Sequence, residues 1–291
     1  MEVIRFDAAD FPRRLAVTGR LAESWEVQLC VDGRIVSLSE VRGAYYRRPT
    51  RFGCRLADDR EQEWATAEAR AGLGGLLLTS VAWLNHPHRS GYANYRPVQL
   101  AAARRAGLTV PATLITSDPA KARAFAAEHG ELIYKPMTHA SPGHGQVVYA
   151  VPITSRDLNG DAGDAIAGTM HLLQRRIRPA YAVRLTAVDD QMFAAAIHAH
   201  SEAAAVDWRS DYDALTYDII EPPADVAHGV RVMMSRLGLR FGALDFLVAP
   251  EGDWYFLEIN PNGQWAWVEQ ETGLTISSAI AGALVTPKPP K

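Results

Sequence analysis

Two carboxylate residues near the C-terminus have a spacing that could hold a metal ion. The segment 242–260 (GALDFLVAPEGDWYFLEIN) contains two β-type runs around Glu251-Gly252. A tight hairpin with its loop at these two residues would place Asp245 directly opposite Glu258. Asn260 would then share a face with Glu258. Ligand sets made only of oxygen favour Mg²⁺ or Mn²⁺.

The other face of this hairpin is expected to be buried, because its residues are all apolar: Leu244, Phe246, Val248, Tyr255, Leu257 and Ile259. Two opposed carboxylates about 5 Å apart repel each other, so we expect positive charge between them. The alternative is that one carboxylate is solvated at a strand end. The Asn-Pro-Asn-Gly turn that starts at Asn260 favours a ligand site, since loops beyond strand ends carry function.

Other charged residues stand in contexts that suit a bound anion. Lys135 ends an apolar run and precedes a turn-rich loop with Gly143 and Gly145. Arg184 lies within an apolar run, A-V-R-L-T-A-V, and a buried arginine needs an anionic partner. The sequence contains neither a complete G-x-G-x-x-G in this loop nor a G-x-x-x-x-G-K-[ST]. These absences argue against Rossmann and P-loop nucleotide sites. A G-x-S-x-G hydrolase motif is also missing.

Alternating strand and helix patterns must position these residues. In the first third we expect strands at 3–6, 25–31, 34–38 and 41–47, and a helix at 60–78. The middle part predicts helices at 97–106 and from Pro119 to Gly130, with strands at 108–115, 131–135 and 147–151. The last part predicts strands at 172–177, 182–188 and 192–198, helices at 224–237 and 276–284, and the hairpin.

Composition excludes several classes of protein. With 291 residues and 48% hydrophobic content the chain is neither disordered nor fibrous, and its length favours two or three lobes. A net charge of −3 gives no bulk attraction to nucleic acid. The two cysteines, Cys30 and Cys54, exclude a disulfide framework and a cysteine zinc site. No membrane span or export signal is evident, so we expect a soluble cytoplasmic protein.

The pattern D-(12 residues)-E-x-N, preceded by a strand-borne lysine and a glycine-containing loop, resembles the ATP-grasp carboxylate ligases. Further segments narrow the resemblance to the graspetide synthetases, the ATP-grasp maturases that build ester or amide links between side chains of ribosomal peptides, as in microviridin biosynthesis. These segments, which span nearly the whole chain, are VIRFDAADFP (3–12), YYRRP (45–49), NHP (85–87), LTVPATLIT (108–116), IYKP (133–136), DWR (207–209) and EINPNG (258–263).

The resemblance implies an α/β (α+β) ATP-grasp fold with an N-terminal lobe (1–90), a central lobe (91–173) and a C-terminal lobe (174–291), and ATP between the last two. It implies that Lys135, Arg96, Gly143 and Gly145 bind phosphates, and that Gln174 and Ile177 take the adenine. Arg184 would face the γ-phosphate or acyl phosphate, and Arg209 the carboxylate to be activated. Asp245, Glu258 and Asn260 would bind Mg²⁺, with Mn²⁺ as a substitute. The implied partners are a precursor peptide, with leader and core, and a second copy of the chain.

The sequence departs from the family pattern in three places. Arg96 stands where a lysine is more usual, and Ala182 where an acidic residue is frequent. Family members usually have a strand and a helix before the segment that resembles VIRFD, so we expect the first lobe to lack them here.

Alternative interpretations remain open. Residue by residue, Lys135 could be a surface lysine, Gln174 an exposed strand amide, and Arg209 part of a surface turn. For the whole chain, the alternatives are a ligase of free small molecules and an inactive peptide-binding paralogue.

Overall fold

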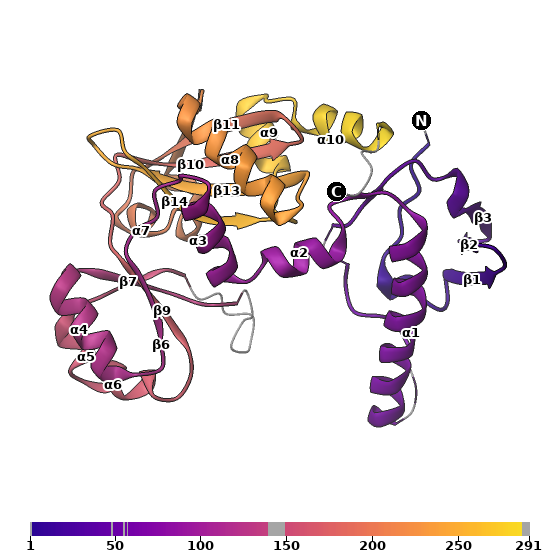
Figure 1. The fold of residues 1–291 in the computed structure, drawn as a ribbon, viewed down its shortest axis with the longest axis horizontal. Helices are drawn as coiled ribbons and strands as arrows, with labels where there is room; N and C mark the ends of the chain where they lie inside the picture. Colours follow the sequence, from indigo (N-terminus) through magenta and orange to yellow (C-terminus); the bar gives the residue numbers. More distant parts are fainter. Residues whose placement is uncertain (1, 48, 55, 57, 139–148, 287–291) are drawn as a thin grey trace. The chain divides into compact units, whose positions relative to one another are not determined.

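The computed structural model describes residues 2–47, 49–54, 56, 58–138 and 149–286. The chain divides into two compact units (Figure 1). Unit 1 comprises Met1–Ser90, Gly238–Arg240 and Ser277–Lys291, and unit 2 comprises Gly91–Leu237 and Phe241–Ile276. Both lobes that the resemblance places after residue 90 lie mainly in unit 2, and the three-lobe division stays a prediction. Among the described residues, no helix has the length and apolar character needed to cross a membrane.

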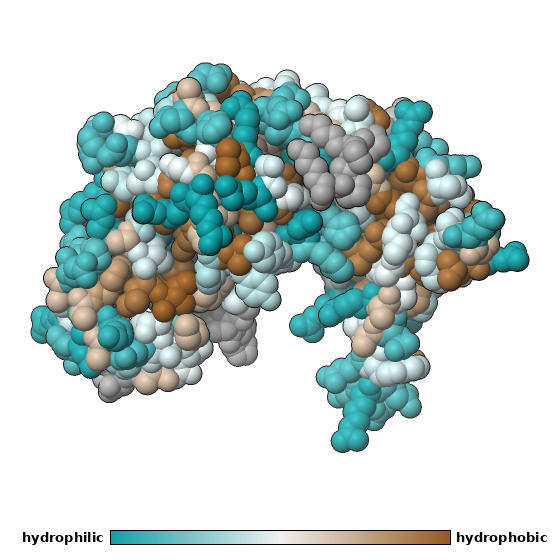
Figure 2. Space-filling view, in the orientation of Figure 1, coloured by the Kyte–Doolittle hydropathy of each residue, from teal (hydrophilic) through white to brown (hydrophobic). Residues whose placement is uncertain are grey.

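Unit 1 is built on a three-stranded antiparallel sheet, β1 (Leu15–Leu21), β2 (Trp25–Val31) and β3 (Arg34–Ser37). The predicted hairpin at Asp32-Gly33 is confirmed, and both turn residues have positive φ, 50° and 82°. The long helix α1 (Asp59–Ser80) contributes Leu73 to the core of the sheet. The part of α1 nearer its N-terminus carries mainly hydrophilic side chains (Figure 2).

Two strand predictions in unit 1 are wrong. Residues 3–6 form no strand. The first strand is β1, which was not predicted because its sequence, LAVTGRL, contains a glycine. Gly19 is required because a Cβ there would lie 2.6 Å from a methyl carbon of Leu76 on α1. The predicted strand at 41–47 is reduced to β4 (Ala44–Tyr45), which pairs in parallel with β5 (Trp83–Leu84). Short 3₁₀ turns at Ala8–Asp10 and Leu38–Glu40 complete this region.

The first sheet of unit 2 has four antiparallel strands in the order β6-β9-β7-β8. They are β6 (Thr113–Thr116), β7 (Leu132–Lys135), β8 (Val151–Ile153) and β9 (His171–Arg175). Helices α4 (Pro119–His129), α5 (Ser155–Leu158) and α6 (Asp161–Ile166) gather beside it (Figure 1). Asp118 caps α4 and Gly130 ends it, as the sequence predicts. The sheet therefore presents Lys135 at the end of one strand and Gln174 on its neighbour.

The second sheet of unit 2 has five antiparallel strands in the order β12-β11-β10-β13-β14. They are β10 (Tyr181–Val188), β11 (Gln191–Ala199), β12 (Leu215–Ile220), β13 (Phe241–Val248) and β14 (Trp254–Asn260). The helices of this part are α3 (Arg96–Arg105), α7 (Glu202–Val206), α8 (Ala224–Leu237) and α9 (Ala266–Thr272), with 3₁₀ turns at Trp208–Ser210 and Tyr212–Ala214. Two helices cross a unit boundary, α2 (Pro87–Ala93) and α10 (Ile276–Val285).

The hairpin β13–β14 confirms the predicted opposition of Asp245 and Glu258, but it reaches that register in another way. Ala249 and Asp253 pair across a three-residue loop in which Gly252 has φ +94°, whereas the sequence predicted a two-residue loop. A β-bulge between Asp245 and Phe246 then restores the register. Relative to the predicted two-residue loop, the observed loop takes Pro250 from the β13 side, whereas the bulge adds one residue to the β14 side. These two changes shift the register in opposite directions, so they cancel at Glu258.

The bulge also corrects the prediction for the buried face of β14. Phe256, which is fully buried, pairs with Phe246, and Tyr255 pairs with Leu247. Tyr255 therefore lies on the same face as Leu247 and Asp245, and it is only half-buried. Leu257, predicted to be in the core, lines a cavity together with Glu258.

Candidate active site

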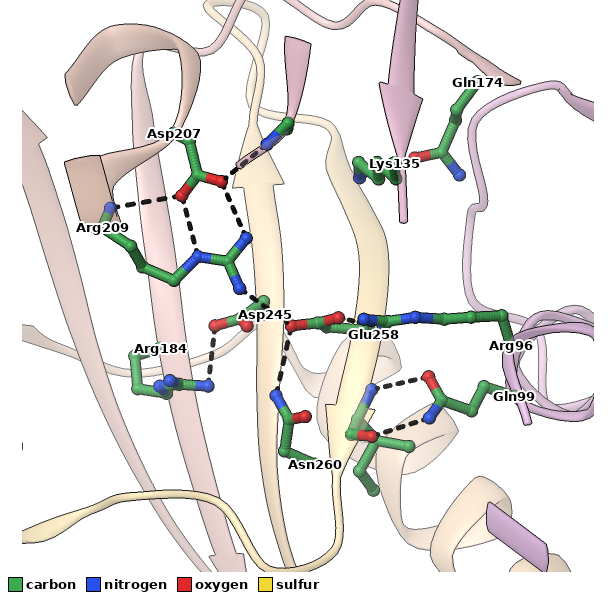
Figure 3. Close-up of polar contacts among 12 residues, drawn as sticks. Arg96, Gln99, Lys135, Gln174, Arg184, Asp207, Arg209, Asp245, Glu258 and Asn260 are labelled. Atoms are coloured by element: carbon green, nitrogen blue, oxygen red, sulfur yellow. Dashed lines mark hydrogen bonds and ion pairs between the residues drawn. The ribbon is translucent and has the colours of Figure 1, made fainter. Parts of the chain in front are cut away.

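Asp245 and Glu258 form a buried carboxylate pair at the centre of the candidate site (Figure 3). Their exposed fractions are 5% and 6%. Asn260 lies two residues beyond Glu258 and donates a hydrogen bond from Nδ2 to Glu258 Oε1 at 3.1 Å. The three predicted metal ligands are thus neighbours on two adjacent strands. A solvated carboxylate at a strand end, the alternative for this pair, does not fit such deep burial.

Three arginines supply the positive charge that the opposed carboxylates require. Arg184, on β10 opposite Asp245, places Nη1 2.9 Å from Asp245 Oδ1. Arg96, at the start of α3, forms an ion pair with Glu258 Oε2. Arg209 places Nη1 3.6 Å from Glu258 Oε1. All three come from different elements, so the charge balance depends on the tertiary fold.

The two carboxyl groups differ strongly in proton affinity. Burial raises the pKa of Asp245 to about 7; Arg184 opposes this rise and the charge of Glu258 adds to it. Burial would also raise the pKa of Glu258, but Arg96 and Arg209 outweigh it and hold that pKa well below its usual range. The arginines therefore compensate Glu258 fully and Asp245 only in part.

Arg184 also keeps a polar atom without a partner. Its Nη1 forms the ion pair with Asp245 Oδ1, although that contact lacks hydrogen-bond geometry, and its buried Nε has no hydrogen-bond partner among the described residues. The guanidinium of Arg184 lies over the rings of Trp208 and Trp267, with Cζ 5.3 and 5.9 Å from their centroids. Buried polar atoms are rarely left unsatisfied, so this point of the site suits a polar ligand.

Two carboxylates and an amide are a small donor set for a metal ion. The described residues contain no group of three or more His, Cys, Asp or Glu side chains that could hold one. Mg²⁺ is commonly bound through one or two carboxylates together with substrate phosphates. Asp245, Glu258 and Asn260 fit that mode, because they offer two carboxylates and one amide oxygen from neighbouring positions.

Arg209 is held by Asp207, a residue to which the sequence analysis assigned no role. Its Nε and Nη2 donate to the two carboxylate oxygens of Asp207, each at 2.8 Å (Figure 3). Asp207 also accepts a hydrogen bond from the backbone of Ala150 at 3.2 Å. Asp207 and Trp208 are buried, whereas the side chain of Arg209 is 38% exposed, so the alternative of a surface turn with a packed tryptophan stays open. The two-pronged edge predicted to bind a substrate carboxylate is occupied by Asp207, which leaves Nη1 facing Glu258.

Lys135 and Gln174 form a second polar group on the four-stranded sheet. Lys135 Nζ donates to Gln174 Oε1 at 2.8 Å, and Gln174 Nε2 donates to Thr113 Oγ1 at 2.9 Å. Gln174 is 2% exposed, so the alternative of an exposed strand amide is wrong. Burial lowers the pKa of Lys135 to about 8, although Glu258 opposes the shift. This lysine is thus a partly desolvated cation, unlike the surface lysine of the alternative interpretation.

One cavity of about 490 Å³ joins the two groups. The predicted site residues that line it are Arg96, Lys135, Gln174, Ile177, Arg209, Asp245 and Glu258. Arg184 and Asn260 contact this set through Asp245 and Glu258. Gly143 and Gly145 lie outside the described residues. A volume of this size suits a small-molecule ligand such as a nucleotide.

Several solved structures similar to this chain are ATP-grasp ligases or macrocyclases solved with peptides. A Chryseobacterium gregarium RiPP-associated ATP-grasp ligase, in complex with ADP and a leader and core peptide, is 26% identical with a TM-score of 0.89, over 99% of this chain and 90% of the other. The macrocyclase MdnC from Microcystis aeruginosa MRC, bound with the precursor peptide MdnA, is 28% identical with a TM-score of 0.85, over 97% and 90%. The chain is similar in fold and sequence to graspetide-type ATP-grasp ligases.

A third similar structure contains a nucleotide and a metal ion. The ATP-grasp ligase PsnB, complexed with a minimal precursor, Mg and ADP, is 25% identical to this chain, with a TM-score of 0.75 over 96% of this chain and 87% of the other. No family model and no curated protein matches the chain.

Sequence reasoning missed three residues of the site, namely Asp207, Trp267 and Gln99. Asp207 stands beside the singled-out Arg209, so its carboxylate was a visible signal. Trp267 lies in α9, a helix that the sequence analysis did not predict. Gln99 binds the backbone of Ile259, which is 160 positions away, and no local sequence pattern predicts such a contact.

Proposed function

We propose that this ligase activates Glu or Asp side chains of a ribosomal precursor peptide and joins them to Thr or Ser hydroxyls or to Lys amines. The products would be macrocyclic esters or amides, with ADP and phosphate released. The observation that carries this proposal is the buried Asp245–Glu258 pair beside Arg96, Arg184 and Arg209. The ADP, Mg and peptides named for the similar solved structures support it.

In this proposal Asp245, Glu258 and Asn260 hold Mg²⁺, or Mn²⁺ in its place. The bound ion neutralises charge that develops on the phosphates during phosphoryl transfer. The high pKa of Asp245 supports this assignment, because a buried carboxylate with an incomplete charge balance favours a cationic ligand. The register that places Asp245 directly opposite Glu258 supports it independently of charge.

The nucleotide would lie along the cavity, with phosphates near Lys135 and Arg96 and adenine near Ile177. Gln174 would act by orienting Lys135, to which it is hydrogen-bonded, in addition to any contact with the base. Gly143 and Gly145 keep their proposed role of offering backbone amides to the phosphates.

The reaction would proceed in two steps around the arginines. A carboxylate oxygen of the peptide attacks the γ-phosphorus, the bond to the β–γ bridging oxygen breaks, and ADP leaves with that electron pair. Arg209, whose Nε and Nη2 are held by Asp207, would bind the incoming carboxylate through Nη1, and Arg184 would bind the transferred phosphoryl group. A hydroxyl or amine of the same peptide then attacks the acyl carbon, loses its proton, and displaces phosphate. Holding both side chains in one closed site supplies much of the acceleration.

We also propose that the ligase acts on leader and core parts of one precursor, as a homodimer in the cytoplasm. A ligase of free small molecules is the weaker candidate, because the similar structures were solved with peptides. An inactive paralogue is disfavoured by the complete Asp245, Glu258 and Asn260 set.

The test is the intact mass of the peptide encoded next to this gene after incubation with the protein and Mg-ATP. We expect a loss of one water for each link, matched by ADP and not AMP. Glu258→Gln should abolish this change and leave peptide affinity largely intact. Glu251→Gln, in the exposed loop of the same hairpin, is the matched control and should retain activity. Full activity of Glu258→Gln would show that the metal assignment is wrong.

A further inference from the structure

Gln99 is a buried glutamine on α3 whose amide is fully engaged with backbone groups. Its exposed fraction is 2%. Oε1 accepts a hydrogen bond from the Ile259 N–H at 3.1 Å, and Nε2 donates to the Ile259 carbonyl at 2.8 Å (Figure 3). Nε2 also donates to the carbonyl of Ala93 at 2.7 Å. One side chain thereby connects β14, α3 and the end of α2.

This contact takes the place of a neighbouring strand. β14 is an edge strand of the five-stranded sheet, so its outer backbone groups have no further strand beside them. Thr109 covers part of this edge, where its carbonyl accepts from Phe256 N at 2.8 Å. Gln99 covers Ile259 in the manner of a paired strand residue, accepting from its N–H and donating to its carbonyl.

The position of this contact matters because of its neighbours. Ile259 lies between Glu258 and Asn260, and its own side chain is fully buried on the other face. Fixing the backbone of Ile259 therefore fixes the direction of both flanking side chains. Arg96 precedes Gln99 by three residues on α3, which places both on one side of the helix, and it forms the ion pair with Glu258.

We propose that Gln99 is a positioning residue for the ligase reaction. Its amide holds the N-terminal part of α3 against β14, so that Arg96, Glu258 and Asn260 form one pre-aligned set for metal and phosphate. This inference rests on the proposed function, in which these residues bind Mg-nucleotide.

The role requires an amide of this length. Glutamine offers a hydrogen-bond acceptor and two donors at the end of its side chain, whereas glutamate at neutral pH offers only acceptors. Methionine has no donor, and its sulfur is a weak acceptor. Gln99→Met keeps the length of the side chain and removes all three hydrogen bonds. Gln99→Asn keeps a neutral amide that is one methylene shorter, which lengthens the hydrogen bonds without burying a charge, so we expect a smaller defect.

The chain provides a matched control in Gln62 on α1, within unit 1. Its Oε1 accepts from Leu56 N at 2.9 Å, and its Nε2 donates to the carbonyl of Cys54. Gln62→Met thus removes the same kind of amide-to-backbone contact from the unit that does not contain the candidate site. A purely structural loss should be visible in both methionine variants.

The test measures Mn²⁺ binding in the presence of ADP by electron paramagnetic resonance, together with the melting temperature and the kcat for ADP release. We expect Gln99→Met to weaken Mn²⁺ binding at least tenfold and to lower kcat, with peptide affinity within twofold. Gln62→Met should bind Mn²⁺ within twofold of the wild type even where its Tm falls.

Wild-type affinity and kcat in Gln99→Met would overturn the inference and leave the proposed function intact. Absence of Mn²⁺–ADP binding in the wild-type protein would overturn both. If Gln99→Met does not fold, Gln99→Asn decides: an affinity equal to that of the wild type contradicts the inference, and a loss of threefold or more supports it.

Discussion

Arg96 and the proposed metal ion compete for the same carboxylate. This competition predicts that removing Arg96 changes the metal affinity in opposite directions without and with nucleotide. Arg96 is paired with Glu258, with side-chain exposures of 12% and 8%. In the proposed function the same side chain contacts phosphate when nucleotide is present. We therefore expect Arg96→Met to strengthen Mn²⁺ binding in the absence of nucleotide and to weaken it in the presence of ATP.

The size of the effect follows from the charges. Two unit charges about 4 Å apart interact by about 4 kcal/mol at an effective dielectric constant of about 20. Arg209 remains near Glu258 after the substitution, at 3.6 Å, and solvent enters the space left by the guanidinium. We expect about 1.4 kcal/mol to survive these effects, which corresponds to about a tenfold change in affinity in each direction.

The assay is a titration with Mn²⁺, followed by electron paramagnetic resonance, with and without a non-hydrolysable ATP analogue. Arg105→Met is the matched control, since Arg105 is an exposed arginine at the other end of α3. Both affinities should stay unchanged in that variant. If Arg96→Met weakens Mn²⁺ binding in both conditions, Arg96 supports the metal site instead of competing for it, and the reasoning is refuted.

Two further predictions concern Lys135 and the aromatic support of Arg184. The pKa of Lys135 is lowered to about 8 in the free protein, and a bound phosphate favours the protonated amine. ADP binding should therefore be accompanied by uptake of a proton, and its affinity should fall as the pH rises through 8. Calorimetry at pH 8.5 in two buffers of different ionisation enthalpy measures this uptake; no uptake, or the same uptake in Lys135→Met, would contradict it. Trp267→Leu should lower kcat by about tenfold, because a buried cation–π contact contributes about 1–2 kcal/mol, with little change in peptide affinity. Trp64→Leu, at an exposed position of unit 1, is the control, and an unchanged kcat in Trp267→Leu would remove the orienting role.

The sequence predicted the parts of the fold that depend on local chemistry. The turn at Asp32-Gly33, the cap at Asp118 and the helix at Ala224–Leu237 all have signals within a few residues. The predicted strand at 3–6 fails because its alternation is not matched by a partner strand. Its neighbour β1 was missed because Gly19 reflects the approach of α1, which is a tertiary contact.

In the candidate site, too, the features with a local sequence signal could be predicted and those that depend on tertiary contacts could not. The opposition of Asp245 and Glu258 could be predicted from one hairpin, and a need for nearby positive charge followed from it. The arginine that meets each carboxylate could not be predicted, because Arg96 and Arg184 come from a separate helix and strand. Gln99 shows the limit most clearly, since its hydrogen bonds join residues 160 positions apart.

The bulge in β14 has a consequence for insertions and deletions. A regular strand turns adjacent residues to opposite faces, yet Leu257 and Glu258 both line the cavity. Removing Leu257 would remove the bulge and make the strand regular, and Glu258 would remain opposite Asp245. Removing one residue from the loop at 250–252 would leave a two-residue connection between Ala249 and Asp253, so the strand pairs would keep their partners. Deletion of Leu257 would thus remove an apolar residue from the cavity lining and keep the carboxylate of Glu258 in place. A substitution at Glu258 removes the carboxylate instead.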